Sequence, residues 1–272
     1  MTNDTNIKVT TVTPELAEAW LGKNTHNRNL RDGHVRGLAR DMLAGAWTWN
    51  GESIKFAPDG TLLDGQHRLS AIVKAGVPVQ MLVIWGVDAE TQHTMDTGSK
   101  RTPGDMLKLR GEKNYNALAA GIRSSIIWDA GGRAFTGSGN GSTVTNPQIL
   151  SYLNEHPEMR DYTKLFVRFR SSVKVPASIG VLAARLFMGI DEADAEYFFD
   201  KLASGEGYKG DPIFELARAL QDASDKTKIS RTPTWKLAVM IKAWNKYRLG
   251  EEVKLLSYRP GGSNREKFPE PI

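Results

Sequence analysis

The stretch that decides the fold is TLLDGQHRLSAIVKAG, residues 61–76. A short apolar run ends at Asp64-Gly65, and the apolar residues Leu69, Ile72 and Val73 then recur at helical spacing. This pattern predicts a strand, a tight turn and a helix. We expect Asp64 to be the helix N-cap and the final glycine to end the helix.

The run that follows this helix, residues 79–85, is rich in β-forming side chains and predicts a strand that returns to the same sheet. Strand, helix and strand would then form a βαβ unit. In such a unit Gln66, His67 and Arg68 lie at the helix N-terminus, beyond the carboxyl end of a strand. Backbone N–H groups and the helix dipole favour an anion there, and Arg68 adds a positive charge. The stretch therefore predicts a phosphate site.

Composition limits the chemistry available to the chain. The 272 residues are 40% hydrophobic and 25% charged, which is typical of a globular protein of one or two domains. The absence of cysteine excludes disulfides, zinc–thiolate sites, cysteine-ligated iron–sulfur clusters and cysteine nucleophiles. The five histidines show no metal-ligand spacing, so we expect no dedicated zinc site. A net charge of +5 and a pI near 9.3 are compatible with a polyanionic partner without requiring one.

The N-terminus has neither a basic region nor an apolar region of the kind found in signal peptides. No apolar run reaches the length that spans a membrane. From the sequence we expect a cytoplasmic protein without a membrane partner.

The order of the elements indicates two domains and a tail. Strand-like runs occur at 7–12, at 53–57 and at Leu62-Leu63 within the opening stretch, and Thr13-Pro14-Glu15 is a helix-start signal. After Pro103 helical periodicity takes over. We predict an α/β (α+β) domain over 1–105, an all-α helical domain over 106–257 and a disordered tail over 258–272. The helices expected in the second domain span 116–128, 147–154, 159–169, 177–189, 192–203, 213–223 and 233–249.

Residues 5–105 resemble the ParB/sulfiredoxin superfamily, in particular its phage and actinobacterial ParB-like nuclease branch. The motifs that carry the resemblance are Asn27-Arg28, Asp64-Gly65-Gln66-His67-Arg68-Leu69, and Met95-Asp96-Thr97-Gly98 with Arg101. The resemblance implies a small α/β fold that binds a nucleoside triphosphate, ATP or CTP with Mg²⁺, with the phosphates at a helix N-terminus. It leaves the helical domain unassigned.

The resemblance also implies roles for individual residues. Arg68 would contact phosphate, Gly65 would permit close backbone approach, and Arg28 would clamp the nucleotide from the other side. Gln66 belongs to the same phosphate-binding box and stands where sulfiredoxins need a cysteine, so sulfiredoxin chemistry is excluded.

Two residues of the box are candidate catalytic groups. Asp64 is either an N-cap alone or a carboxylate near phosphate that holds Mg²⁺ or accepts a proton. His67 is either a general base or phosphate ligand, or a solvated helix histidine. Glu52 is a weaker candidate acid.

The later loop offers a third candidate acid. Asp96 would serve as a metal carboxylate, with Lys100 and Arg101 as a pair of cations that stabilises charge, because phosphoryl transfer depends on positioning and electrostatics. The alternative is an ordinary solvated loop.

Two further patterns have ordinary structural explanations. Trp47 and Trp49 either stack on a base or cover the edge of the core, and the second is favoured. The run Gly137-x-Gly139-x-Gly141 follows no strand and lacks the Gly-Lys-Ser/Thr of a P-loop, so it predicts a flexible loop.

The last helical segment, residues 226–248, carries seven basic residues and no acidic one. Its apolar positions can face a core while Lys236, Lys242 and Lys246 form a basic face. Such a face either follows the phosphates of DNA or is simply solvated.

Together these patterns predict a nucleotide-binding, ParB-like protein that hydrolyses or transfers a phosphate on or alongside DNA, in phage-type DNA metabolism or modification. The resemblance places it in the cytoplasm of a bacterial or phage-infected cell. The alternatives are a non-catalytic DNA-binding or regulatory module and a metal-dependent DNA nuclease. The sequence is compatible with an oligomer and does not specify one.

Overall fold

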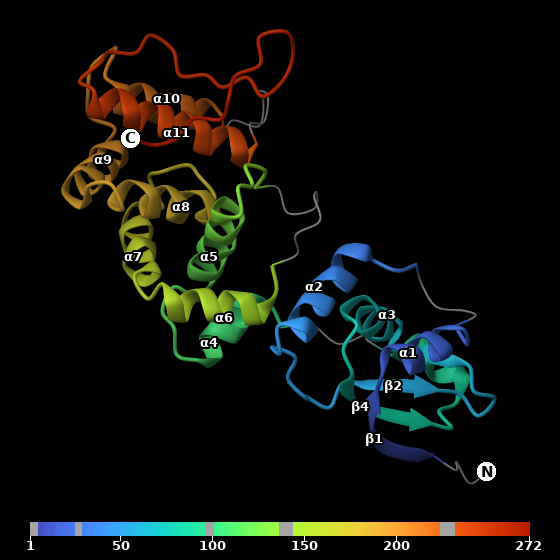
Figure 1. Cartoon of the computed structure of the whole chain (residues 1–272). Helices are drawn as coiled ribbons and strands as arrows, with labels where there is room; N and C mark the ends of the chain where they lie inside the picture. The colour runs from blue at the N-terminus through green and yellow to red at the C-terminus, as the bar shows by residue number, and fades with distance from the viewer. Residues whose placement is uncertain (1–4, 25–28, 96–100, 136–143, 224–231) are drawn as a thin grey trace. The chain divides into compact units, whose positions relative to one another are not determined.

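The computed structural model describes residues 5–24, 29–95, 101–135, 144–223 and 232–272. The chain divides into two compact units, which we call unit 1 (1–100 and 140–147) and unit 2 (101–139 and 148–272). The described residues form eleven α-helices and one four-stranded mixed sheet, so the protein is of the mixed α/β class (Figure 1). The predicted domain boundary, after residue 105, lies close to the division after residue 100.

The sheet of unit 1 has the strand order β1 (Asn6–Val12), β4 (Val79–Trp85), β2 (Ser53–Phe56), β3 (Leu62–Asp64). β1 is antiparallel to β4, β4 is parallel to β2, and β2 is antiparallel to β3. β3 therefore runs opposite to β4, and the predicted βαβ unit with parallel strands is wrong. The reason is the hairpin at Pro58-Asp59-Gly60, which reverses the chain between β2 and β3.

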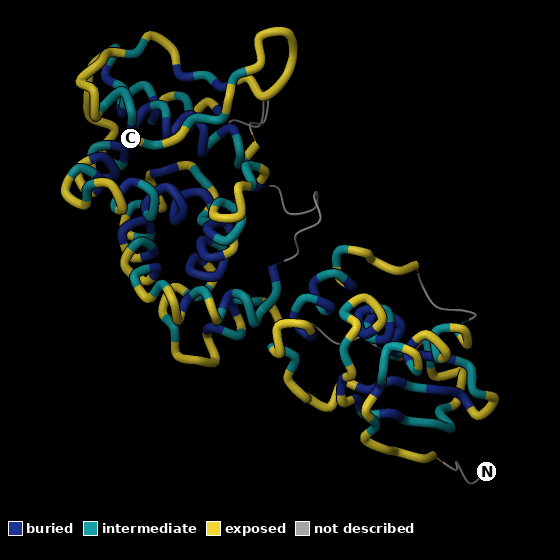
Figure 2. The backbone as a smooth tube through the Cα atoms, in the orientation of Figure 1, coloured by how far each residue is buried: buried dark blue, intermediate teal, exposed yellow. Residues whose placement is uncertain are grey.

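Helices α1 (Pro14–Leu21), α2 (Asp32–Leu43) and α3 (Gln66–Ala75) cover one face of this sheet (Figure 1). The opposite face is open along the edge strand β1, where Ile7 and Val9 are exposed (Figure 2). The core between sheet and helices contains Ile54, Phe56, Met81 and Val83 from the strands and Ala17, Met42, Leu69 and Ile72 from the helices.

The helix ends of unit 1 match the sequence signals in part. Thr13 caps α1 as predicted, because its Oγ1 accepts a hydrogen bond from Leu16 N at 3.2 Å. The expected N-cap of α3 is wrong: Asp64 is the last residue of β3, and Gly65 is the N-cap. Gly76 ends α3 in the left-handed conformation, as expected. A 3₁₀-helix, η1 (Ala89–Thr94), follows β4.

The described residues of unit 2 form helices, the segments that connect them, and a C-terminal segment without helix or strand after Arg248. Its helices are α4 (Pro103–Leu109), α5 (Tyr115–Asp129), α6 (Asn146–Glu155, with its first two residues in unit 1), α7 (Met159–Phe169), α8 (Ala177–Met188), α9 (Glu192–Ser204), α10 (Pro212–Asp222) and α11 (Pro233–Arg248). No helix among the described residues has the length and apolar character needed to cross a lipid bilayer.

The core of unit 2 is built around α8 and α11. The ring of Phe187 stacks on Trp244 with centroids 4.4 Å apart. Glycine lets the helices approach: a Cβ at Gly121 would lie 2.2 Å from Val181 Cγ1, and one at Gly180 would lie 2.0 Å from Phe166 Cε2. These distances are far below van der Waals contact, so both positions require glycine.

The C-terminal segment, expected to be a disordered tail over 258–272, instead packs on unit 2. Phe268 lies edge-on to both Trp128 and Tyr258. The carbonyl oxygen of Ile272 accepts a hydrogen bond from Trp244 Nε1 at 2.9 Å. The proline- and glycine-rich composition suggested disorder, but a few aromatic and polar side chains hold the segment in place.

Candidate functional site

The predicted phosphate site lies where β3 ends and α3 begins. Since β3 is antiparallel to β2, this point is beside the start of β2, and Lys55 pairs directly with Asp64 across the two strands. Opposite residues of an antiparallel pair project to the same face of a sheet. Lys55 is therefore brought to Asp64 by the register of the hairpin.

Four side chains meet here, and we call Glu52, Lys55, Asp64 and Arg68 the Arg68 cluster. Asp64 Oδ2 accepts from Lys55 Nζ at 2.6 Å and from Arg68 Nη2 at 3.2 Å. Arg68 Nη1 donates to Glu52 Oε2 at 2.9 Å. Arg68 Nη2 also donates to the carbonyl oxygen of Ser53 at 2.6 Å. Both cations of the cluster are thus engaged by carboxylates of the same unit.

Burial differs strongly across the cluster. The side chains of Arg68 and Asp64 are 14% and 15% exposed, whereas Glu52 is 55% exposed. Arg68 Nε is buried and has no hydrogen-bond partner among the described residues. The inner pair is accordingly fixed within the fold, and the carboxylate of Glu52 is the partner in contact with solvent.

The pKa of Asp64 lies below its ordinary value. Burial raises this pKa, but the charge of Arg68, the hydrogen bond and charge of Lys55 and the backbone N–H of Gly65 outweigh burial. Asp64 is ionised at neutral pH and holds its charge tightly. A carboxylate in this state is a weak proton acceptor, which argues against the predicted role of general base.

Gly65 is required by the fold of unit 1 itself. Its φ is +106°, and a Cβ would lie 3.2 Å from Ile54 Cα and 3.0 Å from Ile54 Cγ1. The close approach is therefore to β2 of the same sheet. Only glycine lets β3 turn into α3 at this distance.

The next two residues of the box point into the protein. Gln66 is buried, and its Oε1 accepts from Asn24 Nδ2 at 3.0 Å. His67 is also buried, and its Nε2 accepts from the backbone N–H of Arg31 at 3.1 Å. Both side chains are thus engaged inside unit 1. The predicted roles of His67 as general base or phosphate ligand and of Gln66 as phosphate ligand stay predictions.

Several predicted site residues cannot be compared with the cluster. Arg28, Asp96 and Lys100 lie outside the described residues. Arg101 is exposed and belongs to unit 2. Their joint role in one site stays a prediction.

The three lysines expected to form a DNA-binding face are held by unit 2 itself. Lys242 Nζ donates to the carbonyl oxygen of Ser257 and to Glu266 Oε2, each at 2.7 Å. Lys236 Nζ donates to the carbonyl oxygen of Lys174 at 2.9 Å. Lys246 pairs with Glu251. The partners of Lys242 and Lys246 follow α11 in the chain, so the charge pattern within one helix could not reveal them.

The two tryptophans that could stack on a base or cover the edge of the core, Trp47 and Trp49, differ in burial. Trp47 packs against the core of unit 1, which confirms the favoured interpretation for that residue. Trp49 is exposed. Sequence reasoning missed Lys55. Side chains alternate between the two faces along a strand, so Lys55 lies on the face of β2 opposite to that of Ile54 and Phe56, and this alternation could have identified it as a polar residue outside the core.

A metal fits this site poorly. Among the described residues there is no group of three histidine or acidic side chains that could hold an ion. The Oδ2 of Asp64 is already shared by Lys55 and Arg68, and two neighbouring cations repel a third.

Comparisons of the chain with protein-family models, with curated proteins and with solved structures find no match.

Proposed function

We propose that unit 1 binds a nucleoside triphosphate through the Arg68 cluster. The observation that carries the proposal is the convergence of Lys55 and Arg68 at the start of α3, with the half-exposed Glu52 as the outer partner of the arginine. The resemblance of the Asp64 to Arg68 box to the ParB/sulfiredoxin superfamily supports the same ligand.

In this proposal, Arg68 exchanges its exposed partner Glu52 for a phosphate oxygen and keeps its buried partners. Arg68 Nη2 is fixed by Ser53 and Asp64 on the inner side, so the guanidinium stays in place when its outer partner leaves. A phosphate oxygen takes the place of the Glu52 carboxylate on Nη1. Guanidinium binds phosphate as well as carboxylate, and the positive end of the α3 dipole favours the added negative charge.

The Asp64 carboxylate then orients the cations. It holds Lys55 and Arg68 on one oxygen atom and stays ionised at neutral pH. Mg²⁺ would arrive on the phosphates of the nucleotide, since nucleotide-bound Mg²⁺ needs few protein ligands. Hydrolysis or transfer of the terminal phosphate is the catalytic extension of the proposal, and release of inorganic phosphate measures it.

The DNA-binding module and the metal-dependent nuclease have less support. The first relied on Lys236, Lys242 and Lys246, each of which has a partner within unit 2. The second needs a set of acidic metal ligands, and the described residues offer none.

Calorimetric titration of the full chain with ATP and with CTP, with and without Mg²⁺, tests the proposal. We expect one of these nucleotides to bind the wild type and to bind Glu52→Gln up to about fivefold more tightly, because the competing carboxylate is gone. Lys55→Met should weaken binding about tenfold. Lys74→Gln, at the exposed opposite end of α3, is the matched control and should not change the affinity.

Two results would contradict the proposal. One is a wild type that binds neither nucleotide under any of these conditions. The other is equal binding by the wild type, Glu52→Gln and Lys55→Met, which would place the nucleotide elsewhere. Circular dichroism of each variant verifies that it is folded.

A further inference from the structure

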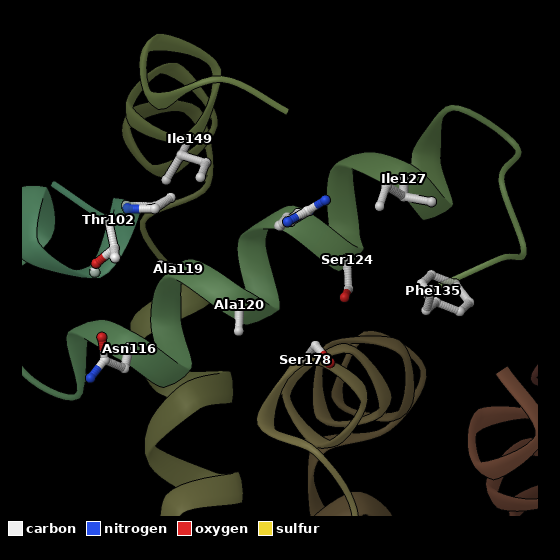
Figure 3. Close-up of a pocket in the computed structure, with 12 residues that line it drawn as sticks. Thr102, Asn116, Ala119, Ala120, Ser124, Ile127, Phe135, Ile149 and Ser178 are labelled. Atoms are coloured by element: carbon white, nitrogen blue, oxygen red, sulfur yellow. The ribbon is translucent and has the colours of Figure 1, made fainter. Parts of the chain in front are cut away.

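A pocket of about 420 Å³ opens within unit 2, beside the middle of α5 (Figure 3). The starts of α4 and α8 form two further walls, and Phe135 and Ile149 complete the lining. Ala119 and Ala120 make the hollow because their side chains are short. The volume is within the range of sites for small organic molecules.

The walls of the pocket are largely apolar, but one buried polar group lies on them. Ser124 is 4% exposed, and it is one of the residues that line the pocket. Figure 3 shows Ser124 extending from α5 toward the start of α8, where Ser178 also lines the pocket. A serine hydroxyl that lines a pocket can donate a hydrogen bond to a ligand oxygen.

The charge of the pocket has one sign. Arg123, an exposed residue of α5, is the only charged residue of the lining, and no ion pair or side-chain hydrogen bond of Arg123 is found among the described residues. Other arginines of unit 2 are paired, such as Arg133 with Glu270 and Arg185 with Asp129. An unpaired arginine at the mouth of an apolar hollow favours a ligand that brings its own negative charge.

The start of α8 adds to this preference. The N-cap of α8 is Pro176, which makes no side-chain cap hydrogen bond. The first turn of this twelve-residue helix therefore keeps its positive partial charge on the side where Ser178 lines the pocket.

We propose that unit 2 binds a small amphiphilic anion in this pocket. The apolar body of the ligand lies against Ala120, Ile127 and Ile149. Its carboxylate or phosphate group pairs with Arg123 and accepts a hydrogen bond from Ser124. The site is independent of the nucleotide site proposed for unit 1, and either can fail without the other.

Fluorescence titration of the full chain with two matched probes tests this site. The probes are 8-anilinonaphthalene-1-sulfonate, which carries a negative charge, and N-phenyl-1-naphthylamine, its neutral counterpart. We expect Arg123→Gln to weaken binding of the sulfonate about tenfold and to leave the neutral probe unchanged. Arg110→Gln, an exposed arginine outside the lining, is the control and should affect neither probe.

A second pair of variants tests the location. Ala120→Leu and Ala120→Trp fill the hollow and should weaken both probes, the larger side chain more. Competition with benzoate and with phenyl phosphate then shows which anionic group the site prefers.

Three outcomes would overturn the proposal. These are no saturable binding of the sulfonate to the wild type, unchanged binding of both probes to the filled variants, and an equal loss of both probes in Arg123→Gln. The last outcome would mean that Arg123 shapes the pocket without selecting charge.

Discussion

Two helices of this protein, α3 in unit 1 and α8 in unit 2, start without a side-chain cap, and each contributes to a site that includes an arginine. At the start of α3, the positive charges of Lys55 and Arg68 are balanced by Asp64 and Glu52. In unit 2, Arg123 of α5 lines the pocket to which Ser178 of α8 also contributes, and no side-chain partner of Arg123 is found among the described residues. The two arginines therefore differ in their partners.

This difference in pairing distinguishes an arginine that stabilises the fold from an arginine that is proposed to bind a ligand. A guanidinium bound to a backbone carbonyl and two carboxylates contributes to stability, and a ligand must compete for it. An unpaired guanidinium contributes little to stability, and a ligand meets no competitor. Replacing Arg68 should consequently lower stability more than replacing Arg123.

The largest effect should come from replacing the two arginines in parallel. Arg68→Met leaves the largely buried Asp64 with Lys55 alone and removes the bond to Ser53, so we expect it to lower the free energy of unfolding by about 3 kcal/mol. Arg123→Met should change it by less than about 0.5 kcal/mol. Urea denaturation at neutral pH measures both.

The double variant Arg68→Met with Asp64→Asn is the control, because removing the stranded charge should recover part of the loss. Equal, small effects of the two arginine replacements would contradict the comparison. They would mean that the Arg68 cluster is not fixed within the fold.

An intermediate effect is expected at the turn that leads into α3. Gly65→Ala should lower the free energy of unfolding by about 2 kcal/mol, because φ is +106° and the new Cβ meets Ile54. Gly76→Ala, at the other end of the same helix, has φ +67° and open space, and should cost about 1 kcal/mol.

The difference between these two glycine variants isolates the contact with Ile54. If both cost the same, the close approach of β2 to the turn adds nothing. The requirement for glycine at position 65 would then be conformational alone.

Much of the fold was predictable because its signals are local. Thr13-Pro14 correctly marked the start of α1, and the hydrophobic period gave α3 and the helices of unit 2. The same signal recurs at Thr102-Pro103, where Asp105 completes a capping box at the start of α4, a helix that is absent from the predicted set. The two signals share one physical cause, so α4 was predictable from the sequence as well.

The site was less predictable because its partners are distant in the sequence. The box placed Arg68 correctly at the start of a helix, but Glu52 and Lys55 reach it only through the pairing of β2 with β3. His67 and Gln66 are buried, and their hydrogen-bond partners Arg31 and Asn24 lie more than 30 residues earlier in the chain. One-dimensional patterns place a side chain on an element and say little about which acceptor reaches it.

The smallest effect should appear in the pH dependence of stability. The pKa of Asp64 is lower in the folded protein than in the unfolded chain, where it is about 3.9. Its ion pairs therefore stabilise the fold above that pH, and this contribution is lost as the pH falls through the lower, folded value. We expect the free energy of unfolding to decline in acid, and to decline less steeply for Asp64→Asn.

Urea denaturation at a series of pH values from about 3 to 7 measures this difference. Other carboxyls contribute to the slope of both proteins: the pKa of Asp59 is also lowered, by hydrogen bonds from Thr61, while burial raises that of Asp41, which acts with the opposite sign. Only the difference between the two curves belongs to Asp64. Parallel curves would mean that Lys55 and Arg68 do not stabilise the ionised carboxylate of Asp64 in solution. Asp64 would then not keep Arg68 in place when a phosphate oxygen replaces the carboxylate of Glu52.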